Sequence, residues 1–183
     1  MKIKILALGG LASVLATVAH AQSGSLSLYD TTSPSFSGGN DITNAVGFTI
    51  NNYISNTQGI GIFTGLASQD FGSVTFSTAN GSSLTFGDAS FGTFASSQII
   101  RSSIAVGAIS YNVLGSYTSG TFDGGAISGQ PAILTISFTE TPSQNGSVSD
   151  SATFSTPPIP EPTTLALTGM GGLVGLLMFR RRK

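Results

Sequence analysis

The feature that most limits the fold is the alternation of apolar and polar residues in the middle of the chain. In Ala132–Thr139, the residues Leu134, Ile136 and Phe138 occupy every second position, with Thr or Ser between them. Residues two apart in a strand share one face, whereas a helical face repeats every three to four residues. No window between residues 22 and 155 shows sustained helical spacing, so the pattern predicts half-buried strands.

Three further segments alternate in the same way: Phe71–Ser77, Ser83–Phe86 and Val148–Phe154. Asn80-Gly81 lies between the first two, and Asn-Gly favours the positive φ angles of tight turns, so we expect a β-hairpin there. Other turn signals are found at Ser37–Asn40, Asp123–Gly125 and Asn145–Gly146.

These patterns predict an all-β domain over residues 22–155, an antiparallel β-sandwich of about seven to nine short strands. The alternative is disorder, because the segment is rich in Gly and Ser. The 12 Phe residues of the chain, with alternating Val, Ile and Leu, supply more core than disordered segments carry. A folded domain is therefore the prediction.

Charge is scarce and unevenly placed. Charged residues make up 8% of the chain, against roughly 25% in ordinary soluble domains. Lys2, Lys4 and the C-terminal cluster leave Arg101 as the one cation of the middle, which has a formal net charge of −6 over residues 22–159. Binding to DNA or RNA needs several cations to neutralise phosphates, so nucleic acid is excluded as a partner.

Few catalytic groups are available. The chain has no Cys, and its single His, His20, lies in the N-terminal segment described below. Ser-His-Asp triads, Cys-His pairs and His-ligated metals are therefore excluded from the middle. Two carboxylates such as Asp123 and Glu140 are the alternative, because glycoside hydrolysis requires a pair. We expect no catalytic residue, no metal ligand and no cofactor.

Two binding hypotheses remain beside this expectation. Acids in Gly- and Asn-rich stretches, namely Asp41, Asp88 and Asp123, could hold a structural calcium ion, although Asp also favours turns without any ion. Tyrosines could stack on a polysaccharide, although Tyr in strands is more often ordinary packing. The candidate tyrosines are Tyr29, Tyr53 (beside Asn51 and Asn52), Tyr111 and Tyr117.

The first 21 residues have the three parts of a secretory signal peptide. Two lysines precede an apolar stretch, and Ala19 and Ala21 are small residues at the positions that signal peptidase requires, with Gln22 next. The alternative is an uncleaved membrane helix, for which the apolar run is short. We expect signal peptidase to cut after Ala21.

The other end begins with a Pro-rich linker, residues 156–162, that contains Pro160, Glu161 and Pro162. Residues 163–179 carry no charge, and 17 residues are the lower limit for a membrane-spanning helix. A basic cytoplasmic tail of residues 180–183 then acts as a stop-transfer signal, following the positive-inside tendency. Its residues are Arg180, Arg181, Arg182 and Lys183.

This combination of Pro-Glu-Pro, short apolar span and basic cluster resembles the PEP-CTERM sorting domain of proteins exported by Gram-negative bacteria. The resemblance covers roughly the last 24 residues of the chain. It implies an exosortase, a membrane enzyme that removes the tail, and a bacterium that makes an extracellular polysaccharide or biofilm matrix. It specifies a route and leaves the activity of the middle open.

The sequence as a whole therefore predicts a non-enzymatic exported protein. We expect an inner-membrane precursor held transiently by its C-terminal helix, and then a cell-surface or extracellular domain associated with polysaccharide. The alternatives are a carboxylate-dependent glycan-cleaving enzyme and an adhesin that recognises another protein. An exposed edge strand or a large apolar patch would indicate the adhesin.

Overall fold

The computed structural model describes residues 23–55, 59–78, 82–141 and 147–157, which form eleven β-strands and one turn of 3-10 helix. In chain order they are β1 (Gly24–Asp30), β2 (Ser35–Ser37), β3 (Gly47–Ile50), β4 (Tyr53–Ser55), β5 (Ile60–Gly61), β6 (Val74–Ser77), β7 (Thr85–Asp88), β8 (Gly92–Ala105), β9 (Ala108–Ser119), η1 (Thr121–Asp123), β10 (Gln130–Glu140) and β11 (Val148–Thr156). The prediction of an all-β domain is confirmed.

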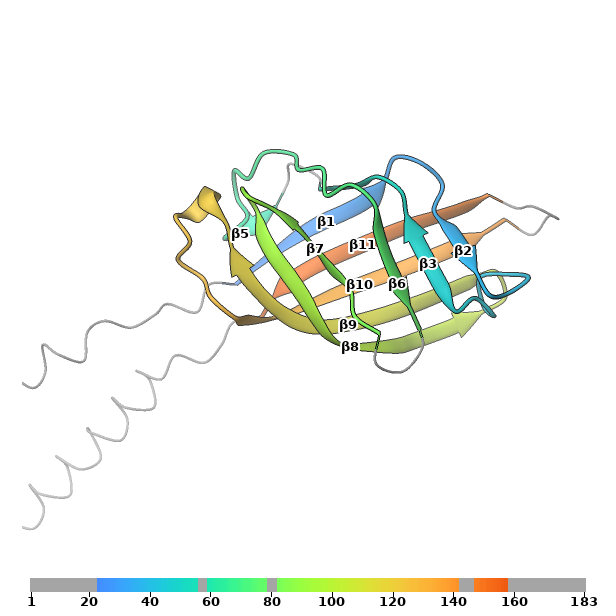
Figure 1. Cartoon of the computed structure of the whole chain (residues 1–183). Coiled ribbons are helices and arrows are strands. Elements are labelled where there is room, and N and C mark those ends of the chain that lie inside the picture. Colours follow the sequence, from blue (N-terminus) through green and yellow to red (C-terminus); the bar gives the residue numbers. More distant parts are fainter. Residues whose placement is uncertain (1–22, 56–58, 79–81, 142–146, 158–183) are drawn as a thin grey trace, which may run out of the picture. The chain divides into compact units, whose positions relative to one another are not determined.

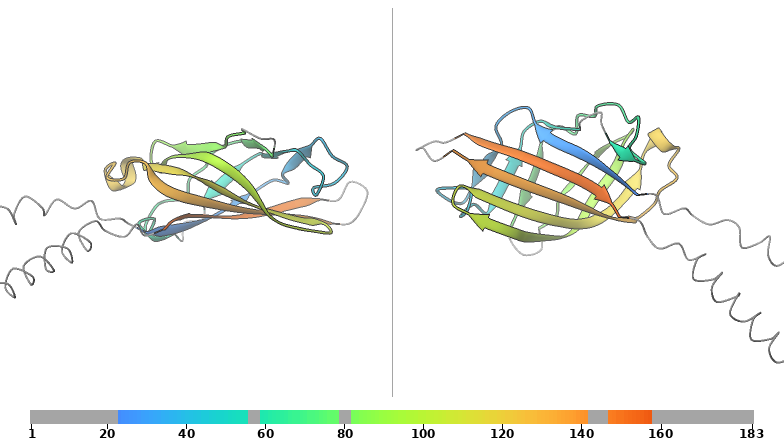
Figure 2. Two further views of the ribbon diagram at one scale, coloured as in Figure 1. Left: turned by 90° about the horizontal axis from the view of Figure 1, so that it is seen from below. Right: turned by 180° about the vertical axis from the view of Figure 1, so that it is seen from behind.

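The strands form two antiparallel sheets. The larger has eight strands in the order β4-β1-β11-β10-β9-β8-β7, with β5 also paired to β1, and the smaller has the order β2-β3-β6. The small sheet lies in front of the larger one (Figure 1), and the view from below shows the two layers with β8 curling between them (Figure 2, left). The core occupies the space between the layers.

One half of this core is built around the ring of Phe154 on β11. Five aromatic rings lie with their centroids 5.3–5.9 Å from it, and they come from β7, β8, β9, the turn before β8 and the turn after β5. These are Phe63, Phe86, Phe91, Phe94 and Tyr117. Edge-to-face contacts of this kind add to the free energy gained from burial.

The other half joins the two sheets directly. Phe48 of the small sheet stacks on Phe138 of β10 with centroids 4.5 Å apart, and Phe76 meets Tyr111 edge-on at 5.6 Å. All four side chains are at most 1% exposed. The small sheet is thus held by aromatic packing, because no strand of one sheet pairs with a strand of the other among the described residues.

The larger sheet curls where β8 changes its pairing. A register shift between Ser96 and Gln98 marks a β-bulge, which bends a strand and increases its twist. Opposite it stands Gly115, where a Cβ atom would come within 2.7 Å of the Phe94 ring. The bulge and the glycine together let the first half of β8, with β7, lie in the front layer (Figure 1).

The chain passes from the small sheet to the larger one through Asn51 and Asn52, between β3 and β4. The carboxylate of Asp30, at the end of β1, accepts the backbone N–H of Asn51 at 2.9 Å and that of Asn52 at 3.1 Å. It also accepts the N–H and the hydroxyl of Thr32. Asp30 therefore holds the crossing in place.

Three expectations about the strands are wrong. The described residues form eleven strands, more than the seven to nine that the sequence predicts. Asn80-Gly81 does not join a hairpin: β6 pairs with β3 in the small sheet, whereas β7 pairs with β8 in the larger one. The residues on either side alternate as predicted, but their partners are distant in sequence. The strands are also not uniformly short, because β8, β9, β10 and β11 contain 14, 12, 11 and 9 residues.

The predicted inward and outward faces are otherwise confirmed. Leu134, Ile136 and Phe138 are fully buried, and Thr135 and Thr139 are exposed on the opposite side. The alternation in Phe71–Ser77, Ser83–Phe86 and Val148–Phe154 likewise separates buried from exposed residues. Period-2 patterns thus locate the core correctly, even where they do not identify the partner strand.

We predict that Phe154→Ala lowers the free energy of unfolding by about 3–5 kcal/mol, because it leaves a cavity among five rings. Thr153→Ala, one residue away on the exposed face, should change it by less than about 0.5 kcal/mol. Urea unfolding followed by tyrosine fluorescence measures both. A cost for Phe154→Ala as small as that of its neighbour would contradict this description of the core.

Candidate functional site

The outward side of β1, β9, β10 and β11 is a continuous surface of hydroxyl-bearing residues, which we call the hydroxyl face. These four strands lie side by side when the domain is seen from behind (Figure 2, right), and their outward residues are exposed or half-buried in regular alternation with the core. Its Ser and Thr residues are Ser25, Ser27, Ser110, Ser116, Thr118, Thr135, Ser137, Thr139, Ser149, Ser151, Thr153 and Ser155.

Hydrogen bonds between neighbouring strands order this face. The Thr139 and Ser149 hydroxyls are 2.7 Å apart, and those of Ser110 and Ser137 are 2.9 Å apart. The Thr135 hydroxyl donates to the Asn112 amide oxygen at 3.1 Å. Because a hydroxyl both donates and accepts, each pair keeps further capacity for an outside partner.

No charged side chain stands on the hydroxyl face. The charged residues of these four strands are Asp30, Glu140 and Asp150, and all three occupy inward positions in the alternation. The acidic net charge of the domain is therefore carried elsewhere. A large neutral surface of hydroxyls suits a neutral, hydroxyl-rich partner, since no desolvated charge opposes contact.

One of the four candidate tyrosines lies on this face. Tyr29 is 42% exposed, pairs with Ile54 of β4, and follows Ser27 on the same side of β1. Tyr53, Tyr111 and Tyr117 are at most 1% exposed, so the hypothesis that they stack on a glycan is wrong. Their inward positions place them in the aromatic core, where burial raises the pKa of each phenol.

The amides beside Tyr53 are structural as well. The Asn51 side chain donates to the Ser33 carbonyl at 3.0 Å, and that of Asn52 lies 2.6 Å from the Thr31 hydroxyl. These contacts close the loop after β1. Asn51 and Asn52 therefore stabilise the crossing between the sheets and do not form a site with Tyr53.

The proposed catalytic pair is not brought together. Asp123 lies in η1, before the start of β10, and Glu140 lies at the end of that 11-residue strand. At about 3.4 Å per residue the two ends are roughly 35 Å apart, whereas paired catalytic carboxylates lie within about 10 Å. Glu140 accepts the backbone N–H of Ile42 at 3.2 Å and so ties the loop before β3 to β10.

The three acids considered for calcium close their own turns. Asp41 accepts the N–H of Thr43 at 2.7 Å, Asp88 accepts the N–H of Ser90 at 2.7 Å, and Asp123 accepts that of Gly125 at 3.0 Å. The Thr43 hydroxyl and N–H lower the pKa of Asp41. Within the described parts of the chain, no three His, Cys, Asp or Glu side chains are grouped as metal ligands.

Sequence patterns did not reveal that the carboxylates of Asp30 and Asp150 lie close together. Asp150 occupies an inward position of β11 opposite Phe138, and its carboxylate accepts the backbone N–H of Asp30 at 3.2 Å. Burial, and secondarily the charge of Asp30, raise the pKa of Asp150. The signal was present: Asp150 interrupts the apolar positions of Val148 to Phe154.

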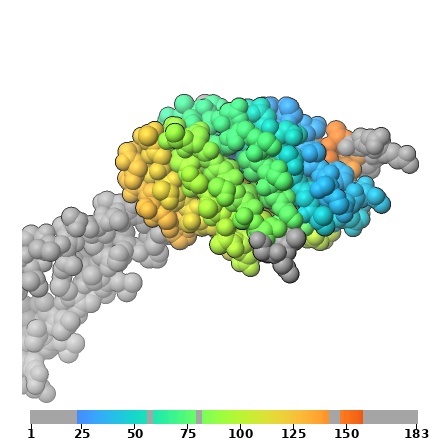
Figure 3. Space-filling view, viewed as in Figure 1, coloured from blue at the N-terminus to red at the C-terminus, as the bar shows by residue number. Residues whose placement is uncertain are grey.

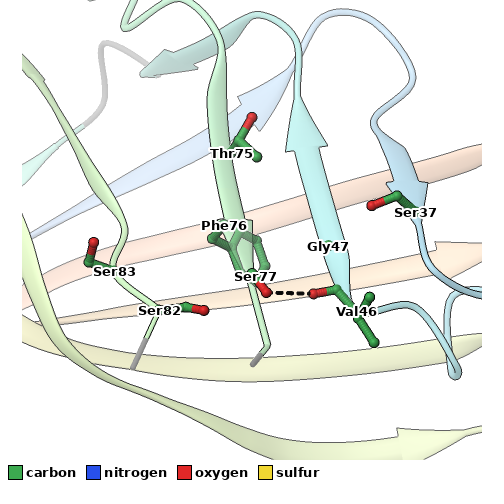
Figure 4. Close-up of a pocket in the computed structure, with 8 residues that line it drawn as sticks. All are labelled: Ser37, Val46, Gly47, Thr75, Phe76, Ser77, Ser82 and Ser83. Carbon is green, nitrogen blue, oxygen red and sulfur yellow. Dashed lines mark hydrogen bonds between the residues drawn. The ribbon is translucent and has the colours of Figure 1, made fainter. Parts of the chain in front are cut away.

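A groove also lies between the small sheet and the segment that precedes β7, as Figure 4 shows. It encloses about 460 Å³, and the Ser77 hydroxyl donates to the Val46 carbonyl at 3.0 Å on its wall. Its lining consists of Ser37, Val46, Gly47, Thr75, Phe76, Ser77, Ser82 and Ser83. None of the eight carries a titratable group, so the groove offers hydrogen bonds without acid–base chemistry.

Together the fold and its surface define an all-β domain with an uncharged, hydroxyl-rich outer face. Residues 158–183 match the family model of the PEP-CTERM protein-sorting motif, so the chain is a PEP-CTERM domain-containing protein. The match supports an exported protein that is sorted to the cell surface by an exosortase. No curated protein and no solved structure matches the chain.

The predicted sorting residues Pro160, Glu161 and Pro162 and the basic residues 180–183 fall inside the matched segment. They lie outside the described residues, as do the predicted signal peptide, with Ala19 and Ala21, and the predicted span 163–179. In the described part of the chain no helix is long and apolar enough to span a membrane. The individual roles of these residues stay predictions.

The raised pKa of Asp150 makes the stability of the domain depend on pH. Above its ordinary value of 3.8 the unfolded chain releases this proton while the folded chain still holds it. The contribution of Asp150 to stability is thus full below about pH 4 and is lost as pH rises through the folded-state pKa.

Asp150→Asn, which keeps the acceptor for the Asp30 N–H, should therefore gain stability relative to the unsubstituted protein as pH rises from about 4 to 7. Urea titrations at several pH values measure this difference. Asp70→Asn removes one charge from an exposed loop and serves as the control. If the Asp150→Asn curve runs parallel to that of the unsubstituted protein, Asp150 is not the titrating group.

Proposed function

We propose that this protein is a non-catalytic binding protein of the cell surface, which associates with extracellular polysaccharide after processing by an exosortase in a Gram-negative bacterium. The observation that carries the proposal is the hydroxyl face, a four-strand surface without charge on which Tyr29 is the exposed aromatic residue. The sorting motif supports delivery to the place where such a polymer is found.

The chemistry of this face favours a neutral glycan. Sugar hydroxyls can exchange hydrogen bonds with paired Ser and Thr side chains, and the apolar face of a sugar ring can lie against Tyr29. Each hydrogen bond adds only about 0.5–1.5 kcal/mol net, so useful affinity requires many contacts along an extended polymer. The formal net charge of −6 over residues 22–159 disfavours strongly anionic polymers at low ionic strength.

The use of the carboxylates supports a non-catalytic role. Asp41, Asp88 and Asp123 hold turns, and both oxygens of Asp30 accept hydrogen bonds from the crossing between the sheets. Asp30 and Asp150, which do lie close together, occupy inward strand positions. Their fixed structural contacts favour a binding protein over a hydrolase.

If Tyr29 is a stacking platform, Tyr29→Ala should weaken polysaccharide binding roughly 2- to 10-fold, the effect of losing about 0.5–1.5 kcal/mol of aromatic contact. Tyr29→Phe should bind normally. Affinity electrophoresis through gels that contain a neutral polysaccharide or an anionic one gives the retardation of each variant.

Val46→Ala is the matched control, because Val46 is 50% exposed and lies beside β3 of the small sheet, outside the hydroxyl face. Equal retardation of Tyr29→Ala and the unsubstituted protein in every gel would remove the basis for the proposed face. Retardation only in the anionic gel would point to a charged ligand instead.

The processing route has its own test. Intact mass of the protein from native cells and from the culture medium should correspond to a chain that begins at Gln22 and ends near Pro160–Pro162, with any attached glycan added. This result follows if signal peptidase and an exosortase both act. A chain that still ends at Lys183 in mature protein would show that residues 163–179 are a lasting anchor.

A further inference from the structure

The second half of β8 has a free edge. Its neighbour β7 pairs only with Gly92–Ala95, and the last hydrogen bond on that side joins the Ser96 N–H to the Leu84 carbonyl at 2.8 Å. From Gln98 to Ala105, β8 pairs with β9 alone among the described residues. Part of β8 emerges along the lower margin of the domain in the space-filling view (Figure 3).

This edge segment, Gln98–Ala105, is exposed on both faces. Seven of its eight residues are classed as exposed, and Ile99 is half-buried against the core. Ile100 is 39% exposed, Ile104 55%, and Val106 in the following turn 99%. Half of the six large exposed apolar side chains of the described domain therefore gather here. An apolar free edge is a common site of strand pairing with another chain.

The register with β9 decides which way each side chain of the edge segment points. Ile99 and Ile104 pair with the buried residues Val113 and Ile109, so they face inward. Ile100 pairs with Asn112 and Ser103 with Ser110, so both face the hydroxyl side. A second register shift, between Arg101 and Ser103, changes the alternation of the strand. Ile99 and Ile104 can therefore face the same side although they are five residues apart.

We propose that the edge segment pairs antiparallel with the edge segment of a second copy of this chain. In the register that places Gln98 opposite Ala105, Ile99 meets Ile104 on the inner side and Ile100 meets Ser103 on the outer side. Both pairs, and that of Gln98 with Ala105, join residues of the same face, as a β-ladder requires, and the residue left over at the register shift, Ser102, lies at the centre. The contact is two-fold symmetric, the commonest arrangement in protein dimers.

Length identifies the second copy as the partner. The edge segment has eight residues, whereas the strands at the other margins have two to four each, namely β2, β4, β5, β6 and β7. Among the described strands, only another copy of the same segment offers a free edge long enough to pair with all of it. An area well below the standard of about 800 Å² per partner makes the contact weak in solution. Attachment of many copies to one surface raises their effective concentration and favours the pairing of two edge segments.

Charge makes the contact dependent on salt. Arg101 is opposite Ser102 in this register and is beside Tyr111 on the inward side, so the two Arg101 residues are diagonal neighbours across the two-fold axis. Their repulsion, and that between two acidic domains, weakens pairing at low ionic strength and is screened as salt is added. The pairing does not use Tyr29, so it does not require the proposed stacking of a sugar on that residue.

Disulfide crosslinking of the full chain tests the register, because the chain has no native Cys. Ile100→Cys and Ser103→Cys are made as separate variants, mixed and oxidised. Directly opposite residues of two antiparallel strands have Cα atoms about 4.5–5.5 Å apart, which suits a disulfide. The mixed dimer should therefore form in several-fold excess over a mixture of Thr93→Cys with Ser103→Cys. Thr93 is an outward residue of β8 where β7 covers the edge. A yield no higher than that of this control overturns the proposal.

Arg101→Glu provides the second measurement. One cysteine variant carries Arg101→Glu as well, and the other keeps Arg101. The crosslinking yield of this mixture at low salt should be roughly 2- to 5-fold higher than that of the two variants that both keep Arg101. The gain arises because opposite charges then meet at the axis, and it should shrink as salt is added. Loss of crosslinking in every combination that contains Arg101→Glu would show that the two Arg101 side chains do not repel each other at the axis, and it would overturn the proposed register.

Discussion

Aromatic packing between the two sheets is the constraint on which the rest of this domain depends. Phe154 touches five rings, and the stack of Phe48 on Phe138 fastens the small sheet to the larger one. The chain has no disulfide that could replace this packing. Nearly every aromatic side chain of the described residues lies inside, and the outward side of β1, β9, β10 and β11 consists mainly of Ser and Thr.

The charged residues of the described domain also serve its fold. The few carboxylates of the described domain are used where the backbone turns or changes sheet, and Asp30 is the clearest case. A carboxylate that accepts two or more N–H groups holds a loop without needing an ion or a buried cation. The two proposed functional surfaces, the neutral hydroxyl face and the free edge of β8, contain no carboxylate that holds the backbone in this way.

Much of the architecture could be predicted, because alternation with a period of two depends only on neighbouring residues. The buried face of β10 and the core role of Phe76, Phe86 and Phe154 follow from it directly. The hairpin at Asn80-Gly81 was wrong, since turn propensity cannot report that the two strands beside it have better partners elsewhere. The tyrosine hypothesis failed in the same way: Tyr111 and Tyr29 look alike in the sequence, and only the sheet decides which of them faces the core.

The sequence by itself determined the class of fold, the sorting motif at residues 158–183 and the shortage of catalytic groups, because each rests on composition or on local order. Tertiary structure alone decided that Asp30 and Asp150 lie close together and that Asp123 and Glu140 do not. It also decided that β8 extends beyond the end of its neighbour β7 and keeps a free edge. The physical reason is that pairing between strands distant in sequence depends on the packing of the whole core, which no short stretch of residues specifies.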